Sequence, residues 1–229
     1  MANKYRTRRL IGLLILLIFS AATIMLHPAL YEPMTPKTDT SVATGQAVDA
    51  LHKLPVKGRA PKTGYARTQF GDGWTIQNGC DTRNIILNRD MTNIVISEDC
   101  KVQSGILNDP YTGQIINFVR GSASSQLVQI DHVVALSNAW QTGAQQLTFA
   151  QREALANDPL ELLAVDGTAN QQKSDGDAAT WLPANKAFRC QYVARQIAVK
   201  QKYTLWITLP EKEAIERVLT TCPGQTMPL

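Results

Sequence analysis

The stretches QIDHVVALSNAW, residues 129–140, and LLAVDGTANQQKSD, residues 162–175, decide the fold. The first predicts a strand that carries Asp131 and His132 side by side in a β-branched run. The second predicts a short buried strand, an Asp-Gly turn and a helix that contains Asn170. A carboxylate, an imidazole and a carboxamide brought together in this way suit one hard cation beside one general base. Such a site can hydrolyse a phosphodiester.

The rest of the chain indicates one α+β domain. From Phe70 onward, about 160 residues carry strand and helix signals, which is enough chain for its own hydrophobic core. The turn residues NDPYTG predict a hairpin over residues 104–119, and Pro183 and Pro210 each predict the start of a helix. Further segments are expected to be a helical or extended run at 84–90, strands at 91–102, 124–136 and 160–165, and helices at 147–156, 184–203 and 211–222.

The N-terminus carries a pattern that is typical of export. Four Lys and Arg residues among the first nine precede an almost unbroken apolar run over residues 10–26. This run lies between a signal-peptide core and a membrane span in length, so residues 1–30 are predicted to be a cleaved signal or an N-terminal membrane anchor. Residues 31–46 predict a flexible linker, and residues 47–229 the folded domain. The domain is then secreted or anchored to the outer face of the cytoplasmic membrane.

The four cysteines fit an exported protein. Cys80, Cys100, Cys190 and Cys222 form an even set, which favours disulfides. There is no CxxC pair and the chain has only three histidines, so a zinc site is not expected. Of the three pairings that four cysteines permit, we expect Cys80–Cys100 and Cys190–Cys222, because each pair brackets one local block.

The charge of the chain is only weakly informative. The formal net charge is +4 and the pI is near 8.9, which is a mild basic excess. Part of this excess lies in the predicted export segment. The charge is compatible with an anionic partner but does not by itself indicate nucleic acid.

The motifs DHVVAL at residues 131–136 and NDPLELLAVDGTANQQKSDGDAATWLP at residues 157–183 resemble the HNH (ββα-metal) nucleases. More narrowly, the chain resembles an exported HNH family related to the C-terminal domain of GmrSD-type restriction enzymes, also through GYART, GCDTRN, DPYTG and FRCQYVARQ. The resemblance implies a single α+β domain, stabilised by disulfides, with an embedded ββα-metal motif over residues 126–182. It also implies a metal-dependent endonuclease that acts on nucleic acid, DNA more than RNA. Little sequence preference is expected, since no separate reading domain is present.

Matched by position, the resemblance makes His132 the general base that activates water. It makes Asp131 and Asn170 the protein ligands of a divalent cation, with water and phosphate completing the shell. These oxygen donors favour Mg²⁺ or Mn²⁺. Taken singly, each residue also has a structural alternative: a packed histidine, a carboxylate at a strand end and a helix cap.

Glu161 departs from the family pattern, because its position usually holds the Asn that braces the loop carrying the base. Three alternatives follow for this carboxylate. It accepts a hydrogen bond from the ring of His132 and thereby raises the pKa of His132, it joins the metal, or it weakens activity. Asn157 is an alternative brace.

Lys173 and Arg83 are further candidates for contacts with phosphate. The alternative for Lys173 is a solvated position on a helix, and the favoured expectation for Arg83 is a structural pair with Asp81.

Two rival functions of the whole protein stay open as well. One is an envelope-associated nucleic-acid-binding protein whose site is weak or inactive, and the other is a purely structural exported domain.

Overall fold

The structure is a computed structural model that describes residues 45–121 and 124–228. The predicted export segment, residues 1–30, and most of the predicted linker, residues 31–46, lie outside the described residues. Within the described part of the chain, no helix is long and apolar enough to cross a membrane.

The chain contains both helices and strands, as the sequence predicts for an α+β domain. The helices are α2 (Gln46–Lys53), α3 (Thr82–Asp90), α4 (Leu136–Gln141), α5 (Phe149–Ala156), α6 (Gly167–Lys173), α7 (Arg189–Lys202) and α8 (Leu209–Leu219). Short 3₁₀ helices are η2 (Arg67–Phe70), η3 (Ala144–Gln146) and η4 (Lys186–Phe188). The strands are β1 (Ile76–Gln77), β2 (Cys80–Asp81), β3 (Met91–Ile96), β4 (Val102–Asn108), β5 (Ile115–Val119), β6 (Val128–His132) and β7 (Leu162–Asp166).

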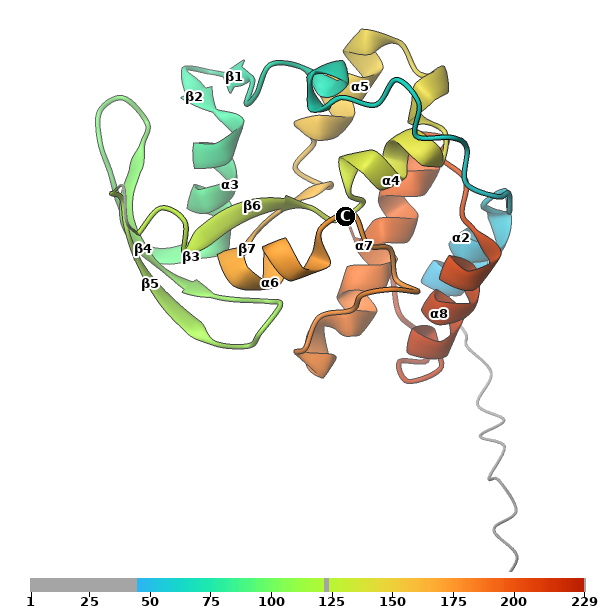
Figure 1. Cartoon of the computed structure of the whole chain (residues 1–229). Helices are drawn as coiled ribbons and strands as arrows, with labels where there is room; N and C mark the ends of the chain where they lie inside the picture. Colours follow the sequence, from blue (N-terminus) through green and yellow to red (C-terminus); the bar gives the residue numbers. More distant parts are fainter. Residues whose placement is uncertain (1–44, 122–123, 229) are drawn as a thin grey trace, which may run out of the picture. The chain divides into compact units, whose positions relative to one another are not determined.

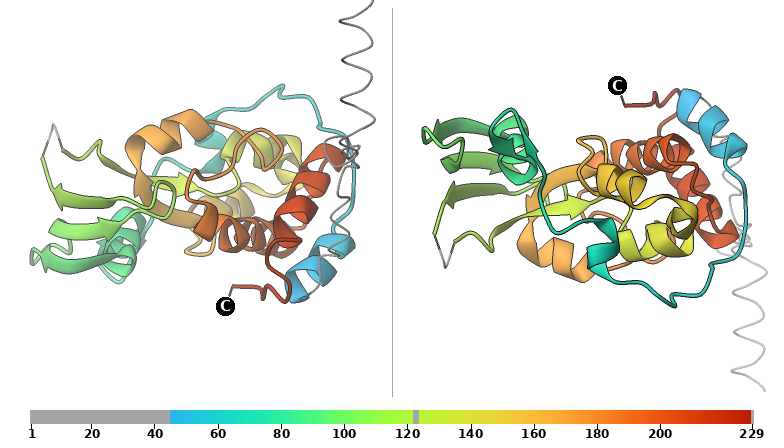
Figure 2. Two further views of the ribbon diagram at one scale, coloured as in Figure 1. Left: turned by 90° about the horizontal axis from the view of Figure 1, so that it is seen from below. Right: turned by 90° about the horizontal axis from the view of Figure 1, so that it is seen from above.

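The strands of the described residues form three separate antiparallel sheets. β1 pairs with β2, β4 lies between β3 and β5, and β6 pairs with β7. The β3–β5 sheet lies at one end of the domain, whereas α2, α7 and α8 gather at the other (Figures 1 and 2). The β6–β7 pair lies between these two ends (Figure 1).

The β6–β7 pair and α6 position the residues that the sequence singles out. The register pairs Asp131 with Leu163 and His132 with Leu162. Successive side chains of a strand point to opposite faces, and here Leu162 packs in one hydrophobic cluster and Leu163 in the other. Helix α6 follows β7 directly, because the side chain of Asp166 caps it by accepting a hydrogen bond of 2.7 Å from the N3 backbone N–H.

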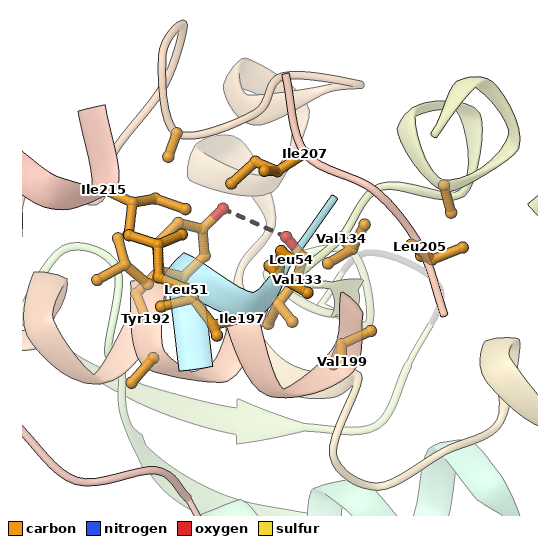
Figure 3. Packing of buried hydrophobic residues seen from close by; sticks show 14 of the residues in the cluster. Leu51, Leu54, Val133, Val134, Tyr192, Ile197, Val199, Leu205, Ile207 and Ile215 are labelled. Carbon is orange, nitrogen blue, oxygen red and sulfur yellow. Dashed lines mark hydrogen bonds between the residues drawn. The ribbon is translucent and has the colours of Figure 1, made fainter. Parts of the chain in front are cut away.

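Two hydrophobic clusters stabilise the domain on either side of the β6–β7 pair. The larger cluster joins α2, α4, α7 and α8 and includes Leu51, Ile197 and Ile215 (Figure 3). Within it, the Tyr192 hydroxyl donates a hydrogen bond of 3.4 Å to the carbonyl of Val133 (Figure 3). The smaller cluster lies between α3, the β3–β5 sheet and the β6–β7 pair. A fully buried leucine or isoleucine side chain contributes about 1.5–3 kcal/mol.

Both predicted disulfides are confirmed. Cys80 of β2 bonds to Cys100 in the turn between β3 and β4, with a Cα–Cα distance of 5.3 Å. Cys190 of α7 bonds to Cys222 beyond the end of α8, with a Cα–Cα distance of 6.4 Å. Each bond therefore closes a local loop, as expected from the spacing.

The hairpin over residues 104–119 is confirmed as β4 and β5, but three other expectations are wrong. The strand expected over residues 124–136 ends at His132, because the chain bends there before α4 begins. The helix expected to begin near Pro183 begins at Arg189, after the 3₁₀ turn η4. The Asp-Gly pair after β7 is a helix start rather than a turn, since its Asp caps α6.

Candidate functional site

An open cleft of about 670 Å³ lies beside the end of β6. Asp131 and His132 line it from β6, Asn170 from α6 and Arg83 from α3. Part of its wall comes from residues 54–75, the segment between α2 and β1, which we call the strap. The cleft thus brings together four of the residues that the sequence predicts for the site.

The ring of His132 is held in one orientation. Its Nε2 lies 3.0 Å from the carbonyl oxygen of Ala156, and a carbonyl can only accept, so Nε2 carries the proton. The indole of Trp74 stacks on the ring, with a centroid distance of 5.8 Å and an interplanar angle of 11°. Nδ1 makes no hydrogen bond with any described residue. This nitrogen is therefore the atom of the neutral ring that can accept a proton.

His132 is neutral at physiological pH. The pKa of His132 is lowered from 6.5 to about 3, mainly by burial, then by the positive charge of Arg67, with a smaller effect from Lys173. The hydrogen bond to Ala156 acts in the opposite direction. Of the three alternatives for Glu161, the structure does not form the hydrogen bond to the ring of His132: the ring binds the carbonyl of Ala156, and Glu161 binds the N–H of Val134.

Asp131 lies in a buried polar network on the opposite face of β6. Its carboxylate accepts a short hydrogen bond from the Tyr111 hydroxyl on one oxygen and a 2.9 Å bond from Lys173 Nζ on the other. Lys173 Nζ also donates to the carbonyl of His132 at 2.7 Å, and its side chain is fully buried. Burial raises the pKa of Asp131, while the Lys173 ammonium opposes this rise. Lys173 is therefore neither solvated nor at the cleft surface.

Asn170 faces β6 across the cleft. Its Nδ2 donates to Oε1 of Gln129 at 2.9 Å, and both residues line the cleft. Gln129 and Asp131 are two positions apart on β6 and so lie on the same face of the strand. Asn170 and Asp131 thus share the cleft without a direct hydrogen bond between their side chains.

Glu161 is completely buried and braces the loop after His132. Its Oε2 accepts a hydrogen bond of 3.2 Å from the N–H of Val134, and its carbonyl accepts one of 2.9 Å from Val133 N–H. Its Oε1 has no hydrogen-bond partner among the described residues. Burial raises the pKa of Glu161 well above its usual value, and this shift favours the neutral carboxyl.

Asn157, the alternative brace, contacts the strap and α5 instead of this loop. Its Oδ1 accepts a hydrogen bond of 2.9 Å from Thr75 N–H. Its Nδ2 donates to the carbonyl of Glu153 at 3.0 Å. Asn157 therefore fixes the end of the strap next to Trp74.

Arg83 lies at the edge of the cleft without the expected partner. One of its guanidinium nitrogens donates to the carbonyl of Val128 at 3.1 Å. Asp81 instead caps α3, accepting hydrogen bonds from the backbone and the side chain of Asn84. Burial lowers the pKa of Arg83, without removing its charge at any physiological pH.

Sequence reasoning missed four residues that shape the site. Gln129 could have been found from strand alternation, because it precedes Asp131 by two positions. Tyr111, Arg67 and Trp74 reach the site from distant segments that carry no helical or strand periodicity. Only the motifs GYART and DPYTG pointed to these segments, without assigning a role.

The donors along the cleft fit a hard cation. Three residues that line the cleft, Asp131, Asn170 and Gln129, carry carboxylate or carboxamide oxygens. Both oxygens of Asp131 already accept hydrogen bonds, but a carboxylate has about four lone-pair positions, so further ones remain. Among the described residues, no three His, Cys, Asp or Glu side chains cluster in a way that would enclose a metal. Carboxylate and carboxamide oxygens suit Mg²⁺ or Mn²⁺, which keep several water ligands, better than Zn²⁺.

Comparison with known proteins places these residues in a family context. The family described as GmrSD restriction endonucleases, C-terminal domain, matches residues 81–218. A protein of Arthroderma benhamiae, described as an uncharacterized secreted protein, is 38% identical over 209 residues, which are 90% of this chain and 98% of that protein. No solved structure matches the chain. The family match includes Asp131, His132 and Asn170, whereas Arg67 and Trp74 lie upstream of it.

Proposed function

The chain belongs to the family of the C-terminal domain of GmrSD restriction endonucleases, and from this membership we propose that it is an exported endonuclease. It hydrolyses phosphodiester bonds of nucleic acid, DNA more than RNA, with a divalent cation and little sequence preference. The family match supports nuclease activity and a nucleic-acid substrate. The assignment of roles below is supported by the cleft.

The observation that carries the proposal is the fixed orientation of His132. Because Nε2–H is bound to the carbonyl of Ala156, Nδ1 is left to take a proton from the attacking water. With a pKa of about 3, the ring is a weak base in the free enzyme. A phosphate anion in the cleft raises that pKa, because negative charge favours the imidazolium. The base thus becomes effective when substrate is bound.

Asp131 and Asn170 are the residues proposed to hold the cation, Mg²⁺ or Mn²⁺. When bound, such a cation neutralises charge on the phosphate and on the leaving oxygen. The Tyr111 hydroxyl and the Lys173 ammonium keep the Asp131 carboxylate in one orientation. Pre-oriented ligands reduce the rearrangement that binding requires.

The remaining predicted residues are proposed to support the site. Lys173 positions both Asp131 and the end of β6, and Glu161 braces the following loop through Val134. Arg83 has guanidinium N–H groups beyond the one bound to Val128, and these contact a phosphate that flanks the cut bond.

Export is supported by three observations. The Arthroderma relative is described as secreted. Both disulfides fit an oxidising compartment. The basic and apolar N-terminal pattern fits a signal segment. We therefore place the protein outside the cell.

Incubation of the purified protein with supercoiled plasmid, and separately with RNA, tests the proposal. Mg²⁺ or Mn²⁺ should convert the plasmid to nicked and linear forms, and EDTA should abolish this until excess metal is added back. DNA should be cut faster than RNA. His132→Ala protein, purified in the same way, controls for contaminating nucleases.

The same assay separates the proposal from its rival, a nucleic-acid-binding protein without activity. The rival is favoured by the engagement of both Asp131 oxygens with Tyr111 and Lys173. Binding of DNA without cleavage in Mg²⁺, Mn²⁺ and Zn²⁺ would contradict the proposed endonuclease and support the rival.

A further inference from the structure

The strap, residues 54–75, is fastened to the domain along its length although it lies outside the family match. Figure 1 shows it in blue-green, running from α2 past α4 and α5 to β1. Arg59 forms an ion pair with Asp177 at 2.6 Å. Further hydrogen bonds join Gly58 to Trp206, Thr63 to Trp140, Gln69 to Arg152 and Thr75 to Asn157. These contacts hold the strap at a defined place beside the cleft.

Arg67 is the cation of the cleft wall whose side chain has no partner among the described residues. Three cationic residues of the described chain line the cleft: Lys62, Arg67 and Arg83. Lys62 forms an ion pair with an aspartate, and Arg83 donates to a backbone carbonyl. Within residues 45–121 and 124–228, the guanidinium of Arg67 forms neither a hydrogen bond nor an ion pair. Its five N–H donors are therefore available to a ligand.

Arg67 also lies close to the proposed base. Arg67, Trp74 and His132 together line both the cleft and a smaller adjoining cavity of about 160 Å³. Among the charges that act on His132, that of Arg67 lowers its pKa most, after the effect of burial. A guanidinium with a planar fork of donors matches the oxygens of a phosphate.

We infer that Arg67 binds the phosphate at which the nucleic acid is cut and holds it over His132, so that the strap forms part of the substrate site. This inference rests on the proposed function, since it names the phosphodiester group as the ligand. Arg67 is then a substrate-binding residue, because its guanidinium donates charged hydrogen bonds to the phosphate.

The test compares the Arg67→Gln protein with its Arg67 parent in a His132→Ala background, in which cleavage should be slow enough for binding to be measured. Fluorescence anisotropy with a labelled oligodeoxynucleotide gives the Kd over a range of salt concentrations. Arg67→Gln should weaken binding by about 10–100-fold, as expected for a lost charged hydrogen bond. The slope of log affinity against log salt should also become less steep by about 1, because one phosphate contact is lost.

Three controls make the comparison specific. Arg217→Gln removes an equal charge from an exposed position on α8 that does not line the cleft, and should leave Kd within about twofold. Arg67→Lys should restore the salt slope but only part of the affinity, since it keeps the charge without the fork. The Arg67→Gln and Arg217→Gln changes are also compared in the protein that keeps His132, with a phosphorothioate oligonucleotide. This comparison guards against misfolding of the His132→Ala background.

Equal affinity and equal salt slope for the Arg67→Gln and Arg217→Gln proteins would overturn the inference. If the unchanged protein cleaves DNA while Arg67→Gln has no effect, this inference alone fails. If the unchanged protein cleaves nothing, the proposed function fails, and the binding comparison still decides whether Arg67 contacts phosphate.

Discussion

Lys173→Met should be strongly destabilising, because it removes one partner of a buried ion pair. The Lys173 side chain is fully buried, and its Nζ lies 2.9 Å from Asp131 Oδ1 and 2.7 Å from the carbonyl of His132. Leaving a buried charge without its partner costs about 3–5 kcal/mol. Met retains most of the apolar stem, so little of this loss comes from packing. In a domain of this size the change corresponds to a fall in Tm of about 6–20 °C.

Lys62→Met provides the matched control. Lys62 also pairs with an aspartate, Asp175, at 3.1 Å, but both side chains are half exposed. Removal of such a surface pair costs about 0–1 kcal/mol. Urea unfolding followed by tryptophan fluorescence, with unchanged m-values, gives the free energy of unfolding for both variants. A Lys173→Met protein no less stable than Lys62→Met would refute the buried-pair account.

The pH dependence of Lys173→Met gives a second check. Lys173 lowers the pKa of Asp131, while burial raises it, so removing the ammonium raises this pKa further. A carboxyl whose folded pKa is raised contributes stability at low pH that is lost as pH rises through the folded value. The stability difference between Lys173→Met and the unchanged protein should therefore narrow as the pH falls. A difference that widens toward acid would contradict the assignment.

Three further predictions concern the disulfides and the buried titratable groups. Replacing both cysteines of either disulfide by Ser should lower the free energy of unfolding by about 2–4 kcal/mol, measured in urea, and mass spectrometry of the unreduced protein should find no free thiol. Glu161→Gln should change stability by less than about 1 kcal/mol, because Gln keeps an acceptor for the N–H of Val134 and burial raises the pKa of Glu161 toward the neutral form. Glu161→Ala leaves this N–H unpaired and should cost about 1–3 kcal/mol. NMR titration should find the pKa of His132 well below 6.5, near 3. The contribution of this group to stability is then complete above pH 6.5 and is lost as the pH falls toward the folded pKa. A ring that titrates near 6.5 would show that His132 is not buried as described.

The parts of the fold that the sequence predicts are those with a local signal. Alternating β-branched residues mark β6, the turn NDPYTG marks the β4–β5 hairpin, and the apolar run before Asp166 marks β7. The disulfide pairs were predictable because each bond closes a short loop. The ends of elements were less predictable, since the bend after His132 depends on the brace from Glu161 rather than on nearby residues.

The candidate site likewise has one part that local sequence patterns predict and another that they do not. The motif residues Asp131, His132 and Asn170 could be predicted to share one region, and the structure brings them to one cleft. The contacts of Asp131 with Tyr111 and Lys173 join residues 20 and 42 positions away, so no local pattern indicates them. The role of the strap depends likewise on its anchoring to distant helices, because the strap has almost no regular structure of its own.

The rate of plasmid cleavage by folded His132→Ala protein tests the central claim most directly. At saturating Mg²⁺, with DNA binding and circular dichroism confirming an intact fold, the rate should fall by about 10²–10⁴-fold relative to the unchanged protein, the usual contribution of a general base. A folded His132→Ala protein that cleaves DNA at the unchanged rate would contradict the account.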